Sequence, residues 1–508
     1  MAAIALSGCA VAATLRAYDV APSGIERSEE KLRVWLSRAR PDSVAMPPRG
    51  SLPDDALVRV LYEGTFAYYN RKWKQAGEKF DEADRIAEAR YTKSVTQNAL
   101  AMLTNDRELD YEPGINERCL MHYYGALAFL GGGDLDGAAV EARKLAYLLQ
   151  KYEGDMLARD RSVRTMLRWF AGAVFEAAGE RNDALVSYRN ARALEGEAVR
   201  GVDDERLPTD GLASDSGDVL VVVEQGYVAF PVPFDLAVPV YRHEAAYYGS
   251  GADRSRSAWM SGRVGWRLTA QLAALSGGGL YYHGMPGALP ADDRWGTMTA
   301  GNPADVNIVY RPGNSYGYRY DPRWGWQPVR AVLPDKIIKL SIPVWRPPRR
   351  AARVEAVAGD AAGRAIAFGD LSEAEVADFE RVRTWTYARA VLRTTIKAVA
   401  AEAAEEAAKK AARDKKKGEK DDKTAERWGR VFGFLSSAAG AILERADTRN
   451  WNLLPHAVNL VRLRLPAGKQ EVTVRVGNGT ELRIPDVTVR AGQLTFASTR
   501  VWGTEAEW

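Results

Sequence analysis

Small and large side chains alternate with helical spacing at positions where two antiparallel helices would touch. One copy of the pattern comprises Gly172, Phe175, Ala184, Tyr188 and Ala191. Small residues let two helix backbones approach closely, and the rings fill the space on either side. The spacing therefore predicts a helical hairpin that packs through these five residues.

The same pattern occurs twice upstream. Its members are Gly64, Ala76, Phe80 and Ala83 in one copy, and Ala126, Phe129 and Ala138 in the other. Self-similar helix pairs are typical of tetratricopeptide repeats (TPRs), which stack into scaffolds with a concave binding face. We therefore predict a TPR-like helical repeat domain over residues 54–200.

Length and charge limit the remaining possibilities. A chain of 508 residues is too long for one core and predicts roughly three domains. The 70 basic and 66 acidic residues give a mixed surface rather than the concentrated cationic face of a nucleic-acid binder, so we expect no nucleic acid partner. No stretch reaches the ~18–20 apolar residues that span a bilayer.

The rest of the chain predicts a multidomain α+β protein. Residues 217–369 form a β-containing region, with strands at Asp218–Val223 and Ile337–Val344 and a Gly-rich, aromatic insertion over about 247–328. Valine and leucine alternate with polar residues in 451–508, which predicts a small antiparallel β-sandwich.

A long helical hairpin is expected between these regions, over residues 370–450. Ser372 and Glu375 have capping-box spacing at its start. A lysine-rich turn and a second helix, about 424–445, follow. Self-association through helices 372–445 is a possible consequence.

The N-terminus carries a short motif, Leu6-Ser7-Gly8-Cys9. It resembles a bacterial lipobox, in which the cysteine is acylated after signal cleavage, so 1–53 is interpreted as a signal remnant and tether, with Met1 inside the true signal. The absence of Asp after Cys9 resembles lipoproteins of the outer membrane. Only eight residues, none of them basic, precede Cys9, so an ordinary apolar N-terminus is the alternative. Cys119 is expected to pack as a small buried hydrophobe.

Several segments resemble a poorly characterised family of bacterial TPR lipoproteins. They include Leu61-Tyr62-Glu63-Gly64, His122-Tyr123-Tyr124 and the block from Glu444 to Pro455. The resemblance covers most of the chain apart from the aromatic insertion. It implies an exported, lipid-anchored protein and brings no reaction, cofactor or catalytic residue.

Motifs for catalysis are incomplete. Gly313-Asn314-Ser315-Tyr316-Gly317 has the G-x-S-x-G form, but a nucleophile elbow must open a helix and Pro322 follows soon after. His243-Glu244 begins a zinc helix that has Tyr247 in place of the second histidine. We therefore predict no catalytic, cofactor-binding or metal-ligating residues and a chain that is not an enzyme.

Asp447, Arg449 and Trp451 mark the entry to the C-terminal strands. They could form a recognition edge, but hydrogen bonds that fix the junction are the favoured interpretation. The sequence as a whole predicts a non-enzymatic scaffold or adaptor at the periplasmic face of the outer membrane. It would bind protein partners of unknown identity in its TPR groove and the membrane through lipid on Cys9. A cell-envelope hydrolase or glycan-binding protein that uses the aromatic insertion, or a structural subunit of an envelope assembly, remains the alternative.

Overall fold

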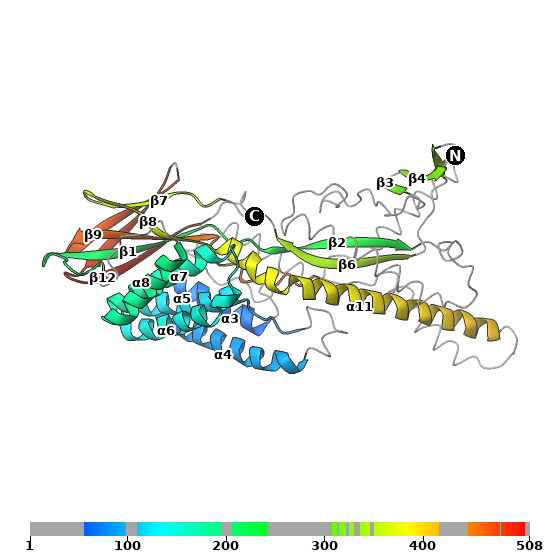
Figure 1. Cartoon of the computed structure of the whole chain (residues 1–508), viewed down its shortest axis with the longest axis horizontal. Coiled ribbons are helices and arrows are strands. Elements are labelled where there is room, and N and C mark those ends of the chain that lie inside the picture. Colours follow the sequence, from blue (N-terminus) through cyan, green and yellow to red (C-terminus); the bar gives the residue numbers. More distant parts are fainter. Residues whose placement is uncertain are drawn as a thin grey trace.

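The computed structural model is an α+β protein in which N-terminal helices precede C-terminal strands (Figure 1). It describes residues 55–97, 109–195, 206–240, 307–311, 314–321, 325–329, 336–345, 350–415, 446–477 and 479–502. The helices lie under one face of a curved sheet, and one long helix projects away from both (Figure 1).

The N-terminal helices form antiparallel hairpins, and each helix contacts the next along the chain. Asp55 begins the first helix because its carboxylate accepts the backbone N–H groups of Leu57 and Val58. Gly133 and Gly179 adopt positive φ at two of the hairpin turns. The helices are α3 (Ala56–Tyr69), α4 (Trp73–Gln97), α5 (Ile115–Gly131), α6 (Leu135–Lys151), α7 (Arg161–Ala177) and α8 (Arg181–Glu195), with a short 3₁₀ turn at Glu153–Asp155.

Glycines and rings meet inside two of the hairpins. A Cβ on Gly64 would lie 3.1 Å from the Phe80 ring, and a Cβ on Gly172 would lie 2.6 Å from the Tyr188 ring. In the middle hairpin the half-buried Phe129 instead lies against Gly77 and Gly137. The remaining residues of the pattern are buried: Ala76, Ala83, Ala126, Ala138, Phe175, Ala184 and Ala191.

The C-terminal strands belong to one seven-stranded mixed sheet with the order β11-β10-β7-β8-β9-β1-β12. β1 runs parallel to β12, and the remaining pairs are antiparallel. The strands are β1 (Ser216–Gln225), β7 (Val354–Ala358), β8 (Ala361–Asp370), β9 (Ala457–Pro466), β10 (Gly468–Val476), β11 (Thr480–Val489) and β12 (Leu494–Val501).

The prediction of a separate β-sandwich over 451–508 is wrong. β1 lies between β9 and β12, so the C-terminal strands complete a sheet together with strands from residues 216–370. The sheet curls into a barrel-like shape in which β11 contacts β12. Its interior is filled mainly by valines from β1, β7, β9, β10 and β11. Alternation located the strands correctly, but it does not encode which strands pair.

A second set of elements extends from the body. The antiparallel ribbon of β2 (Pro231–Val240) and β6 (Lys336–Trp345) runs beside α11 (Leu371–Lys415) (Figure 1). With 45 residues, α11 is about 67 Å long. β3 (Asn307–Arg311), β4 (Asn314–Asp321) and β5 (Gly325–Val329) form a three-stranded sheet. The expected return helix, 424–445, lies outside the described residues, as does most of the aromatic insertion.

The start of α11 differs from the predicted capping box. Asp370 caps the helix, because its carboxylate accepts the backbone N–H of Glu373. The hydroxyl of Ser372 instead accepts the backbone N–H of Ala229, and Glu375 is buried. A long-range partner has therefore replaced the local bond that the sequence predicts.

Gly172→Ala tests the close helix contact. The added methyl group would overlap the Tyr188 ring, so we expect a loss of about 1–3 kcal/mol in the free energy of unfolding, measured by urea denaturation. Gly154→Ala is the control, because no atom lies within 4 Å of its Cβ position, and it should change stability by less than about 0.5 kcal/mol. Equal effects of the two substitutions would contradict the proposed contact.

Candidate interaction surface

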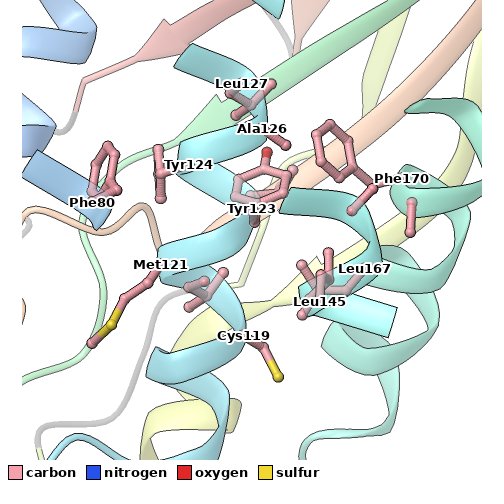
Figure 2. Packing of buried hydrophobic residues seen from close by; sticks show 14 of the residues in the cluster. Phe80, Cys119, Met121, Tyr123, Tyr124, Ala126, Leu127, Leu145, Leu167 and Phe170 are labelled. Carbon is pink, nitrogen blue, oxygen red and sulfur yellow. The ribbon is translucent and has the colours of Figure 1, made fainter. Parts of the chain in front are cut away.

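The inner helices of the hairpins are covered on more than one side. Every residue of α5 from Asn116 to Ala128 is buried, whereas a surface helix has one exposed face. Figure 2 shows the rings around α5, where Tyr123 packs edge-on against Phe170 of α7 with ring centroids 4.6 Å apart. Phe170 also packs against Phe496 of β12. The same core includes Leu220 and Leu460 from the sheet.

The sheet covers the inner side of the helical hairpins. α7 contacts β8, β9 and β12, and the hydroxyl of Tyr68 on α3 donates to that of Ser498 on β12. The face that α3 and α7 turn away from α4 and α8 is thus occupied by the chain's own strands.

A buried glutamate and a buried arginine connect α3 and α5 to the sheet through hydrogen bonds with tyrosines. Tyr69 and Tyr124 each donate a hydroxyl hydrogen bond of 2.7 Å to the Glu224 carboxylate on β1. Arg500 is the register partner of Glu224 on β12 and donates to the Tyr69 hydroxyl at 2.5 Å. Burial raises the pKa of Glu224, while Arg500 opposes the shift. Hydrogen bonds to both charges make this pair an anchor for the helices.

Arg500 is also surrounded by aromatic rings. Its guanidinium carbon lies 4.0 Å from the ring centroid of Trp502 and about 5 Å from those of Tyr69 and Tyr227. The backbone carbonyls of Leu453 and Gly226 accept hydrogen bonds from its Nη1 and Nη2 groups. The Arg500 side chain therefore occupies the space between these three rings.

The predicted junction residues are brought together, and they bond within the molecule. Arg449 donates to both Asp447 oxygens, at 2.9 and 2.7 Å, and reaches Asp55 at 3.4 Å. Trp451 is fully buried and its indole N–H donates to the Thr65 hydroxyl at 2.9 Å. These contacts attach the segment before β9 to α3.

The first turns of α11 are fixed to the body by acidic residues. The Asp378 carboxylate accepts the backbone N–H of Asn116 at 2.8 Å and so caps α5 from a distant helix. Arg381 pairs with Asp378 and Asp160. Arg159 pairs with Glu373 at 2.6 Å. These contacts fix the direction in which α11 leaves the body.

Beyond this root, α11 has one covered side and one exposed side. β6 covers one side, where Trp345 packs on Phe379 with centroids 4.5 Å apart and the Tyr387 hydroxyl donates to the Pro343 carbonyl. The other side exposes large apolar residues at spacings of 3 and 7. Val382, Trp385 and Leu392 have exposed fractions of 52%, 49% and 43%. We call these three residues the α11 apolar face.

Large apolar side chains are also exposed elsewhere. Val140 and Tyr147 lie one heptad apart on α6, and Val186 lies on α8. Ile366 and Phe368 are exposed on β8. The α11 apolar face differs from these in lying on a helix that projects from the body (Figure 1).

The other candidate residues do not assemble a reaction centre in the described ranges. Ser315 lies within β4, opposite Tyr310 of β3, and not on a strand-to-helix turn. Cys119 is buried, and burial raises the pKa of its thiol to about 12. No group of three or more His, Cys, Asp or Glu in those ranges could hold a metal ion. Cys9 and His243 lie outside them.

None of the helices in the described part of the chain is long and apolar enough to cross a membrane.

No family model, curated protein or solved structure matches this chain.

Sequence reasoning missed the buried charged residues that connect distant elements. Glu224 and Arg500 stand in strands 276 positions apart (500 − 224), and Asp378 stands 262 positions from its partner Asn116. The only signal was Glu224 itself, a charged residue at the end of an apolar strand. Its partner could not be inferred from spacing.

Trp451→Ala tests the junction. Removal of a fully buried ring should lower the free energy of unfolding by about 3–5 kcal/mol, measured by denaturant titration. Trp385→Ala, a matched change at a half-exposed position, should alter stability by about 0.5 kcal/mol or less. A small effect at position 451 would show that the indole does not fill the core.

Proposed function

We propose that this protein is a non-enzymatic scaffold or adaptor, anchored by lipid on Cys9 at the periplasmic face of the outer membrane, that binds a protein partner through the α11 apolar face. The observation that carries the proposal is the exposure of Val382, Trp385 and Leu392 on a helix whose root is fixed.

The chemistry of this face fits a protein partner. Contiguous exposed apolar side chains on a folded protein commonly mark interaction sites, and tryptophan is enriched in interface cores. Trp385 is flanked on the same side by Val382, one helical turn away. Ion pairs and β6 hold α11 in place before any partner arrives, and such preorganisation lowers the entropy lost on binding.

The helical hairpins supply the rigid support in this proposal. The contacts of Gly64 with Phe80 and of Gly172 with Tyr188 support a TPR-like interpretation of residues 54–200. The sheet packs on the inner helices, so we place no bound peptide on that side of the hairpins. We therefore propose the α11 apolar face, and not the predicted TPR groove, as the surface that binds the partner.

The envelope hydrolase gains no support from the position of Ser315, since a strand residue opposite Tyr310 lacks the strained turn that exposes a nucleophile. A structural subunit would use the same α11 apolar face for a second copy of the chain. The mass of the adduct formed at Trp385 distinguishes a second copy of the chain from another protein.

Cys9→Ser tests the anchor. We expect loss of acyl labelling and release of the protein into the soluble fraction, because only the thiol of Cys9 can take the lipid. Cys119→Ser is the control, and its labelling should be unchanged because that thiol is buried. Membrane association that persists in Cys9→Ser would contradict lipid anchoring.

A photo-crosslinking residue at Trp385 tests the partner surface. We expect a discrete adduct with another protein, and a titration of the identified partner should show about tenfold or greater weakening in Trp385→Ala. The same crosslinker at Tyr147, an exposed aromatic on α6, is the control. An adduct of twice the chain mass would indicate a second copy, and equal adducts at both positions would contradict a specific site.

A further inference from the structure

Four carboxyl groups meet at the root of α11. Glu117 lies in the first turn of α5, Asp160 precedes α7, and Glu375 and Asp378 lie on α11. All four are buried. We call them the root acids. Buried carboxylates are costly unless cations or hydrogen-bond donors satisfy them.

Two of the root acids have basic partners. Asp378 pairs with Arg381 at 2.6 Å and accepts the backbone N–H of Asn116. Asp160 pairs with Arg381 and lies 3.4 Å from Arg164 of α7. Their charges are compensated across the α5, α7 and α11 interface.

Among the described residues, no ion pair joins the other two root acids to a cation. Oε2 of Glu117 accepts the Tyr111 hydroxyl at 2.5 Å and the Gly114 backbone N–H at 3.2 Å. Oε1 of Glu117 and Oε1 of Glu375 are buried, and no donor among the described residues lies in hydrogen-bonding geometry with either. The backbone N–H of Trp451 nevertheless opposes the effect of burial on the pKa of Glu117. The charged groups that face Glu375 are themselves acids, Glu117 and Asp378.

Protonation of Glu375 removes its repulsion from Glu117 and Asp378. Burial, with repulsion from Glu117 and Asp378, raises the pKa of Glu375 well above its usual range. Burial also raises the pKa of Asp378 to about 7, with Arg381 opposing the shift. Both groups therefore bind protons more tightly when α11 is packed on α5 than when it is free.

We infer that the root of α11 is a proton-dependent latch, in which α11 stays packed on α5 while Glu375 is protonated and loosens as the root acids ionise. The surrounding groups are Tyr111, Arg164 of α7, Arg381 of α11, and Asp447 with Arg449 in the segment before β9. The inference concerns only how α11 is held, and so it stands whatever partner the α11 apolar face binds.

The direction of the pH dependence follows from the raised pKa values. Protons are bound more tightly in the packed state, so packing is favoured at low pH and is weakened as pH rises from the usual carboxyl range through the raised pKa values. Each proton released on opening makes the opening equilibrium about tenfold more favourable per pH unit in that window.

Hydrogen–deuterium exchange on the full chain, from mildly acidic to mildly alkaline pH, tests the latch. After division by intrinsic exchange rates, opening of residues 371–380 and 115–118 should rise with pH in the native protein, by up to about tenfold per pH unit for each proton released. Glu375→Gln is neutral at every pH, so its profile should be flatter.

Two further variants make the result decisive. Glu117→Gln removes repulsion from the opposite side and should also flatten the profile, which covers the case in which Glu375→Gln does not fold. Glu380→Gln is the matched control on the same helix, where Glu380 pairs with Arg159 at 3.3 Å, and it should keep the native slope. A flat native profile, or a native slope that survives both Glu375→Gln and Glu117→Gln, would overturn the latch.

Discussion

The structure depends on a core that the inner helices share with the sheet. β1 has apolar residues on both faces: Val221 points into the barrel-like sheet, and Leu220 packs in the helical core. A strand that is buried on both sides reads as a continuous apolar run rather than an alternating one. The continuous apolar run from Val219 to Val223 is therefore explained by this shared core. Removal of the helices or of the sheet would expose apolar residues of the other layer.

Polar contacts then fix how the two layers lie on each other. Apolar packing alone would allow the helices to slide, because dispersion and burial are not directional. The Glu224 carboxylate with its two tyrosine donors, and Trp451 with Thr65, permit only one register. The same contacts cover the inner helices, and for this reason we propose the partner surface on the projecting α11.

Local pattern predicted the elements, and tertiary pairing decided the rest. Small and large residues located the hairpins, and Asp218–Val223 was recognised as a buried strand because short-range spacing determines both. The prediction of a separate β-sandwich was wrong because alternation along a strand does not specify which strand it pairs with. The capping box failed for a similar reason: the Ser372 hydroxyl found the Ala229 backbone N–H across the fold, which no spacing rule could supply. Glu224, Arg500 and Asp378 each bond to a residue 100 or more positions away and were missed for that reason.

The root of α11 shows how one favourable contact creates an unfavourable one. Asp378 is drawn to the start of α5 because free N–H groups and the helix dipole favour a negative charge there. Glu375 lies three residues earlier, on the same side of α11, so docking Asp378 also brings Glu375 against Glu117 of α5. Arg381 compensates Asp378 but does not act on Glu375. The same helix geometry that attaches α11 thus requires one acid to keep its proton, and the attachment of the arm is coupled to pH.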